Sequence, residues 1–194
     1  MKSGSVEGTA RVLRILVELA LVCNVILVYL VPVAVMMDRH NLLGGVAEYL
    51  TGILRPGEDD IVGAAVAASL LSWVWVWGET YRLVLAAFLV VSGICTAVIL
   101  LQARRVLGSI AAGVPFSLEN GVSLRRAAVC CFVISVAALV RVLFGVWFYR
   151  SPLPLASYNA LFVPMFAMGG LLCLVMSALF RQAAELKEEN DLTI

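Results

Sequence analysis

Residues 104–126 read RRVLGSIAAGVPFSLENGVSLRR, and this stretch decides how the chain folds. It lies between two strongly apolar segments and has a pair of arginines at each end. Its centre contains Gly113, then Pro115, then Ser117. Glycine often ends a helix in the left-handed conformation, proline follows shortly after, and serine caps the next helix. The stretch therefore predicts the turn of a helical hairpin.

The arms of this hairpin are predicted over residues 81–112 and 118–149. The hydroxyl of Ser117 is placed to accept from the N–H near Asn120, and Glu119 in the first turn complements the helix dipole. At 1.5 Å per residue each arm is about 48 Å long, whereas the hydrocarbon core of a bilayer is about 30 Å thick. Both arms are therefore expected to project beyond the membrane at the turn.

The composition is that of an integral membrane protein. Apolar residues make up 62% of the chain and its mean hydropathy is +1.01, well above the about 45–50% apolar content of soluble domains. The net charge of +1 provides no basic field for direct nucleic-acid binding. The lipid bilayer is the first partner that the sequence indicates.

We expect an all-α polytopic membrane protein that forms one integral membrane domain over residues 1–194. The four predicted transmembrane helices are residues 12–37, 81–103, 127–149 and 160–180. The segments between and beside them are a flexible N-terminus (1–10), an outer segment (38–80), a cytoplasmic turn (104–126), an outer loop (150–159) and a cytoplasmic tail (181–194).

The outer segment contains an apolar run, residues 61–78, that is almost long enough to cross the membrane. Short loops rich in Lys and Arg stay in the cytoplasm. Four crossings put nine basic residues inside and four outside, and a fifth crossing would break this bias. We therefore interpret 61–78 as re-entrant or interfacial. Both termini and the turn are predicted to be cytoplasmic, in a bacterial cytoplasmic (inner) membrane.

Two short stretches resemble the signatures of a bacterial family. They are GVPFSLEN at residues 113–120, followed by Leu124 and Arg125, and the closing ENDLTI at residues 189–194. They are similar to those of the YoaS-like membrane proteins, domain of unknown function twenty-nine seventy-five. The resemblance implies four transmembrane helices. It also implies that a small Cro/C1-type helix-turn-helix regulator is often encoded beside the gene, and it implies no specific activity.

Three polar residues interrupt the predicted spans: Glu18, Asn24 and Arg141. Such residues usually face a bundle interior or a cavity. Glu18 lies roughly 9 Å and Arg141 roughly 21 Å from the cytoplasmic end of its helix at 1.5 Å per residue, which argues against a direct pair. Asn24 lies at a membrane depth closer to that of Arg141 and is a better candidate partner for it. Alternatively, Arg141 extends toward Glu79 on the outer side. Structural pairing and a proton or solute pathway both stay open.

No enzyme, cofactor or metal site is predicted. Cys130 and Cys131 are adjacent, so they lie on different helix faces and lack the spacing of a redox motif. His40 is the only histidine. The sequence has no glycine-rich phosphate loop and no nucleophile beside a base.

The last helix is predicted to continue past Phe180 to about Glu189, because the intervening residues favour helix and include no breaker. We expect this tail to dock on the hairpin turn through Leu186 and Leu192, against apolar residues such as Phe116.

The predicted function is that of a regulatory or sensory membrane protein whose turn and tail bind a partner such as a small helix-turn-helix transcription regulator. The alternative is a small transport or immunity-type membrane protein with a polar intramembrane pathway. Besides the bilayer and the regulator, a second copy of this chain is a further candidate partner, which would make the protein a homo-oligomer. The predicted partner surface consists of Arg104, Arg105, Pro115, Phe116, Ser117, Glu119, Asn120, Arg125, Arg126 and Asp191.

Overall fold

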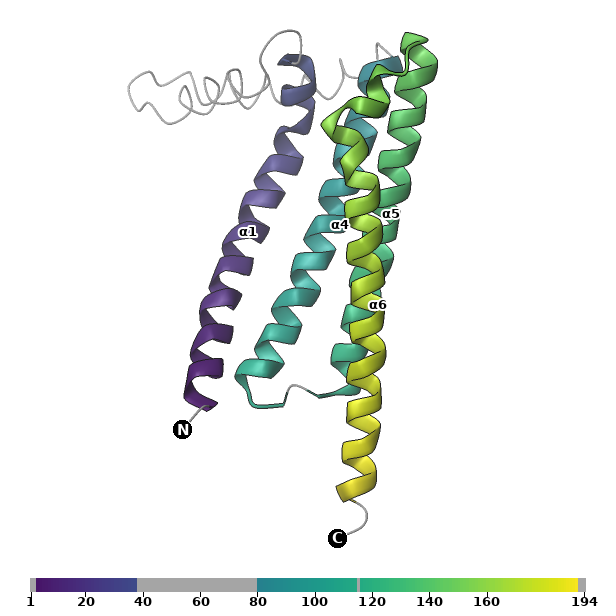
Figure 1. The fold of residues 1–194 in the computed structure, drawn as a ribbon. Coiled ribbons are helices and arrows are strands. Elements are labelled where there is room, and N and C mark those ends of the chain that lie inside the picture. Colours follow the sequence, from purple (N-terminus) through teal and green to yellow (C-terminus); the bar gives the residue numbers. More distant parts are fainter. Residues whose placement is uncertain (1–2, 38–79, 115, 192–194) are drawn as a thin grey trace, which may run out of the picture. The chain divides into compact units, whose positions relative to one another are not determined.

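The computed structural model describes residues 3–37, 80–114 and 116–191, and all regular structure in them is helical. The elements are α1 (Ser3–Met37), α4 (Thr80–Ala111), α5 (Leu118–Tyr149), the short 3-10 helix η2 (Leu153–Ala156) and α6 (Tyr158–Asp191) (Figure 1). Four of these helices are long and apolar enough to cross a membrane. The predicted four-helix membrane architecture is thus confirmed at this level, and the predictions for 38–79 fall outside the described residues.

The chain divides into two compact units, which are described separately. One comprises Met1–Val25 and Ser92–Ile194, and the other is Ile26–Val91. In the second unit a small apolar core joins the end of α1 to the start of α4. Its members are Val31, Val35, Leu85, Ala86, Leu89 and Val90.

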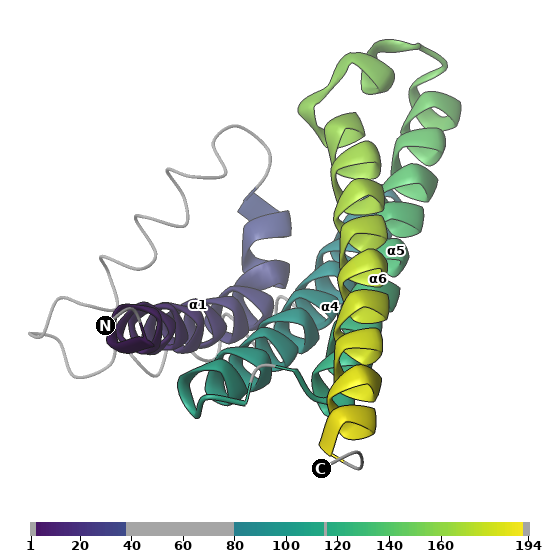
Figure 2. The ribbon, with the colours of Figure 1, turned by 60° about the horizontal axis from the view of Figure 1, so that its bottom comes forward.

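The first unit is built on the antiparallel pair α5 and α6, which lie side by side and are joined by η2 (Figures 1 and 2). Buried residues recur every three or four positions along one face of α5, and most of them are small. Small residues let two membrane helices approach closely. They include Gly121, Ala128, Cys131, Ser135, Ala138, Val142 and Gly145.

Two buried serines also tie α6 to α5. The hydroxyl of Ser135 donates to the carbonyl of Val163 at 2.8 Å, and that of Ser177 donates to the carbonyl of Gly121 at 2.7 Å. Each hydroxyl thus finds a partner away from water, as buried polar groups must. The two bonds fix the register of the pair near both of its ends.

Two adjacent glycines of α6, Gly169 and Gly170, differ in their surroundings. A Cβ added at Gly170 would lie 3.0 Å from the ring of Phe132, whereas one at Gly169 would meet nothing within 4 Å. The close approach of α5 to α6 therefore involves Gly170 and not Gly169. The outer faces of α5 and α6 expose large apolar side chains such as Val136 and Met168, which suits contact with lipid.

Two helix ends test the predicted boundaries. α1 begins at Ser3, so the flexible N-terminus predicted for 1–10 is wrong from Ser3 onward. An established helix extends at little cost through polar residues that include no proline. α6 runs to Asp191, which confirms the predicted continuation beyond Phe180.

Candidate functional site at the hairpin turn

The turn between α4 and α5 begins at a glycine with positive φ. Gly113 has a φ of 77°, and its N–H donates to the carbonyl of Ile110 at 3.1 Å. The N–H of Val114 donates to the carbonyl of Ser109 at 3.0 Å. These two bonds form a Schellman motif, which satisfies the last carbonyls of α4. The predicted helix stop at Gly113 is confirmed.

α5 then starts at the predicted cap. Ser117 has extended backbone angles, and its hydroxyl accepts from the N–H of Asn120 at 3.3 Å. Glu119 lies in the first turn, where a negative charge favours the helix dipole. The local signals read from the sequence therefore place both ends of the turn correctly.

A buried amide links the two arms behind the turn. Asn120 is only 3% exposed, and its side-chain nitrogen donates to the hydroxyl of Ser109 on α4 at 2.5 Å. That hydroxyl donates in turn to the carbonyl of Val106 at 2.8 Å. Asn120 was predicted as a partner-binding residue, but here it holds the hairpin together. Ser109 was not predicted, although it is a polar residue one turn before the helix stop.

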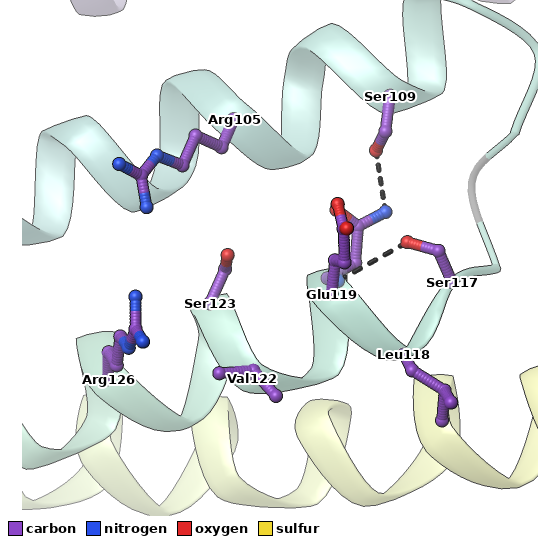
Figure 3. Close-up of a pocket in the computed structure, with 9 residues that line it drawn as sticks. Arg105, Ser109, Ser117, Leu118, Glu119, Val122, Ser123 and Arg126 are labelled. Carbon is purple, nitrogen blue, oxygen red and sulfur yellow. Dashed lines mark hydrogen bonds between the residues drawn. The ribbon is translucent and has the colours of Figure 1, made fainter.

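Beside this link lies a hollow of about 600 Å³ between α4 and α5. Figure 3 shows the guanidinium groups of Arg105 and Arg126 facing each other across it, with the hydroxyl of Ser123 close by. Glu119 also lines the hollow. The hollow thus has two guanidinium groups, three serines and one carboxylate on a surface that a small anion could reach.

Glu18 lies among arginines in the same unit as the hairpin turn. Its carboxylate accepts from Arg104 at 2.9 Å and from Arg14 at 3.4 Å. The three side chains are close to half exposed, and such pairs contribute only about 0–1 kcal/mol in water. Arg104 is therefore engaged within the chain, while a second hollow of about 320 Å³ opens beside Arg14 and Arg104.

The other two intramembrane polar residues do not join Glu18. Arg141 donates to the side-chain oxygen of Asn159 at the start of α6, at 3.2 Å. The Oδ1 atom of Asn24 is buried without a hydrogen-bond partner among the described residues. The predicted Arg141–Asn24 pair is thus wrong, because the α5–α6 register puts Asn159 within reach first. Glu79 lies outside the described residues.

The last residue of the predicted fourth span and the first residue of the tail both lie near the turn, and Arg181 of the tail packs against Gly121 at the start of α5. The rings of Phe116 and Phe180 lie 5.6 Å apart, inclined by 47°. Leu186 is 61% exposed, so the prediction that it docks the tail is wrong. Ser177 and Phe180 are already level with the start of α5, so Leu186 lies further along α6 than the first residues of α5. Leu192 lies outside the described residues.

Residues 67–194 match a family described as a protein of unknown function, DUF2975. The chain belongs to this family. The match includes α4, the hairpin turn, α5 and α6, which confirms the resemblance drawn from the turn and the closing residues. No curated protein and no solved structure matches the chain.

In this DUF2975 protein, the remaining residues of the predicted partner surface lie in different parts of the structure. Arg105, Arg125 and Arg126 are exposed. Asp191 is the last residue of α6, and Pro115 lies outside the described residues. The predicted partner surface is therefore not one patch. Arg105 and Arg126 line the hollow between α4 and α5, Arg125 does not, and Asp191 lies at the end of α6.

The cysteines of the DUF2975 helices meet across helix boundaries. The thiol of Cys130 lies near that of Cys95 on α4, and the thiol of Cys131 lies near that of Cys173 on α6. The adjacent pair thus faces two different helices, as their spacing predicted. All of these thiols are free.

Proposed function

We propose that this protein is a regulatory or sensory membrane protein of the bacterial inner membrane. In this proposal its cytoplasmic hairpin turn and the end of α6 bind a soluble partner, a small helix-turn-helix transcription regulator. The proposed activity is binding, with no catalysis and no cofactor. The observation that supports it best is the end of α6, which we call the α6 extension and define as residues 182–191.

The α6 extension reaches past the structure beside it. Ser177 is bonded to Gly121, and Phe180 contacts Phe116, so these residues are level with the start of α5. From Phe180 to Asp191 the helix continues for about 16 Å at 1.5 Å per residue. A helix that long and that exposed provides a binding surface at the membrane boundary.

The chemistry of the α6 extension favours a basic partner. It has four acidic residues and one lysine, and Leu186 lies exposed among them. Proteins that bind DNA carry basic surfaces to neutralise phosphates. An apolar residue surrounded by carboxylates suits a partner helix with an apolar centre and a basic rim. Leu186 is the proposed anchor of that contact.

The family resemblance supports the same choice of partner. It implies that many members are encoded beside a small helix-turn-helix regulator. The arginines at the turn support the proposed orientation, since short basic loops stay cytoplasmic. A regulator held on this surface would be kept at the membrane and away from DNA.

The experiment uses the full chain in detergent and, purified, the small helix-turn-helix regulator that the resemblance implies beside the gene. Leu186→Asp should weaken capture of the regulator by about tenfold or more, since an anchor residue typically contributes 1.4 kcal/mol or more. Leu153→Asp is the matched control, because Leu153 is 74% exposed in η2, at the opposite end of α5. No capture by the parent, or equal loss in both variants, contradicts the proposal.

The alternative, a small transport or immunity-type protein, has one observation in its favour. Three buried polar atoms lack hydrogen-bond partners among the described residues: Asn24 Oδ1, Ser92 Oγ and Gln102 Oε1. Unsatisfied polar atoms within apolar spans can mark a solute path. Reconstituted vesicles containing Asn24→Leu should then leak less than vesicles containing the parent. Equal leak removes this support.

A further inference from the structure

The hollow between α4 and α5 has the chemistry of an anion site. Arg105 lies in the second-last turn of α4 and Arg126 in the third turn of α5. Their guanidinium groups point toward one another across the hollow (Figure 3). Neither forms an ion pair within the described residues. Two facing positive charges repel each other, and an anion between them would turn that repulsion into attraction.

Ser123 is the second, independent sign of a ligand. It is 7% exposed and lines the hollow, with its hydroxyl pointing toward α4 on one side of the two guanidinium groups (Figure 3). A serine inside a helix usually donates to a carbonyl three or four residues earlier. No hydrogen bond of the Ser123 hydroxyl is found among the described residues, so the group remains available to a ligand in the hollow.

The N-terminus of α5 also favours a negatively charged ligand in the hollow. Glu119 and Asn120, in its first turn, also line the hollow. The N-terminus of a helix carries about half a positive charge and favours phosphate. The carboxylate of Glu119 opposes this attraction, so its removal should strengthen anion binding.

The hollow is expected to lie at the level of the lipid phosphates when the helices cross a bilayer. Arg105 lies 25 residues after Thr80 and Arg126 lies 23 residues before Tyr149, which is about 38 and 35 Å along the two helices. The hydrocarbon core is about 30 Å thick. Both arginines are therefore expected just outside the hydrocarbon, where lipid headgroups lie.

We propose that this hollow binds a phosphate group, held by the guanidinium groups of Arg105 and Arg126 and by the hydroxyl of Ser123. Arginine binds phosphate oxygens in a bidentate manner, and serine can donate one further hydrogen bond. An anionic phospholipid headgroup and free phosphate share this chemistry. The site is separate from the α6 extension and does not depend on a protein partner.

The experiment uses the full chain in nanodiscs of phosphatidylcholine, with phosphatidylglycerol or inorganic phosphate as the probe. Native mass spectrometry measures how much of each probe is retained. Arg105→Gln combined with Arg126→Gln should lower retention by about tenfold or more, since hydrogen bonds to charged groups contribute most. Ser123→Ala should lower it by a smaller factor, and Glu119→Gln should raise it.

Arg125→Gln is the matched control, because it removes the same charge from the neighbouring residue, which does not line the hollow. Its retention should equal that of the parent. If phosphatidylglycerol is retained and millimolar phosphate does not displace it, the site binds a lipid headgroup. If only phosphate is retained, the site binds the free anion. Both results support the proposal.

The proposal is overturned if Arg125→Gln loses as much binding as the double variant, or if neither probe is retained above the level of the double variant. Thermal unfolding in detergent separates these results from misfolding. If the double variant unfolds at a lower temperature than the parent, Ser123→Ala and Glu119→Gln still test the phosphate site. Ser123→Ala must lower probe retention and Glu119→Gln must raise it. No shift in either contradicts the site.

Discussion

The side-chain amide of Asn120 donates to the hydroxyl of Ser109 at 2.5 Å, so a partly buried hydrogen bond joins the two arms of the hairpin behind its turn. Asn120→Ala should lower the free energy of unfolding by about 0.5–1.5 kcal/mol, because it removes this hydrogen bond. Denaturant titration of the purified protein measures this. In a double-mutant cycle with Ser109→Ala, purely additive losses would contradict a direct contact.

Close packing of α6 on α5 predicts different outcomes at two adjacent glycines. Gly170→Ala should destabilise the protein by about 1–3 kcal/mol, because the new Cβ would press on Phe132. Gly169→Ala is the control. It meets nothing within 4 Å and should be neutral or stabilising by up to about 1 kcal/mol from helix propensity. Equal effects in the two variants would show that the α5–α6 register is wrong.

The cysteine contacts predict a selective cross-link. In a chain that retains only Cys131 and Cys173, a mild oxidant should join α5 to α6, because the two thiols lie near each other. The chain that retains only Cys130 and Cys173 should stay uncross-linked, since Cys130 faces Cys95 instead. Proteolysis between the helices followed by gel electrophoresis distinguishes the two. Cross-linking of both pairs to the same extent would contradict the described faces.

The predicted orientation can be tested with introduced thiols at the two ends of α5. In a chain without other cysteines, Leu153→Cys should react with an impermeant thiol reagent in intact cells. Val114→Cys should react only in inverted vesicles. Both positions are exposed, Leu153 at 74% and Val114 at 49%, so access through the protein does not limit either reaction. The reverse pattern would place the hairpin turn outside.

The turn could be predicted from sequence because its signals are local. Gly113 and Ser117 act through their own backbone angles and neighbouring N–H groups, which need no knowledge of the rest of the fold. The convergence of Arg105, Ser123 and Arg126 could not be predicted in the same way. It depends on how α4 is rotated and shifted against α5, and that is decided by many side-chain contacts.

The errors have the same physical origin. Leu186 was expected to dock because it is apolar, but its contacts depend on how far α6 runs past α5. Arg141 was matched to partners by depth, whereas Asn159 on the next helix lies within 3.2 Å. Depth and hydropathy describe each helix alone. Register between helices comes from small residues and serine bonds, which have little hydropathic signal.

The bonds from Ser135 and Ser177 to main-chain carbonyls have a mechanical consequence. Both acceptors belong to the backbone of the opposite helix, so the bonds depend on position and not on the side chain at the acceptor. A slide of α6 by less than a helical turn would break both bonds, and only a slide of about one turn, 5.4 Å, would bring an equivalent carbonyl to each hydroxyl, at the cost of moving Gly170 away from Phe132. The pair should therefore shift in a single all-or-none step and resist small gradual displacements.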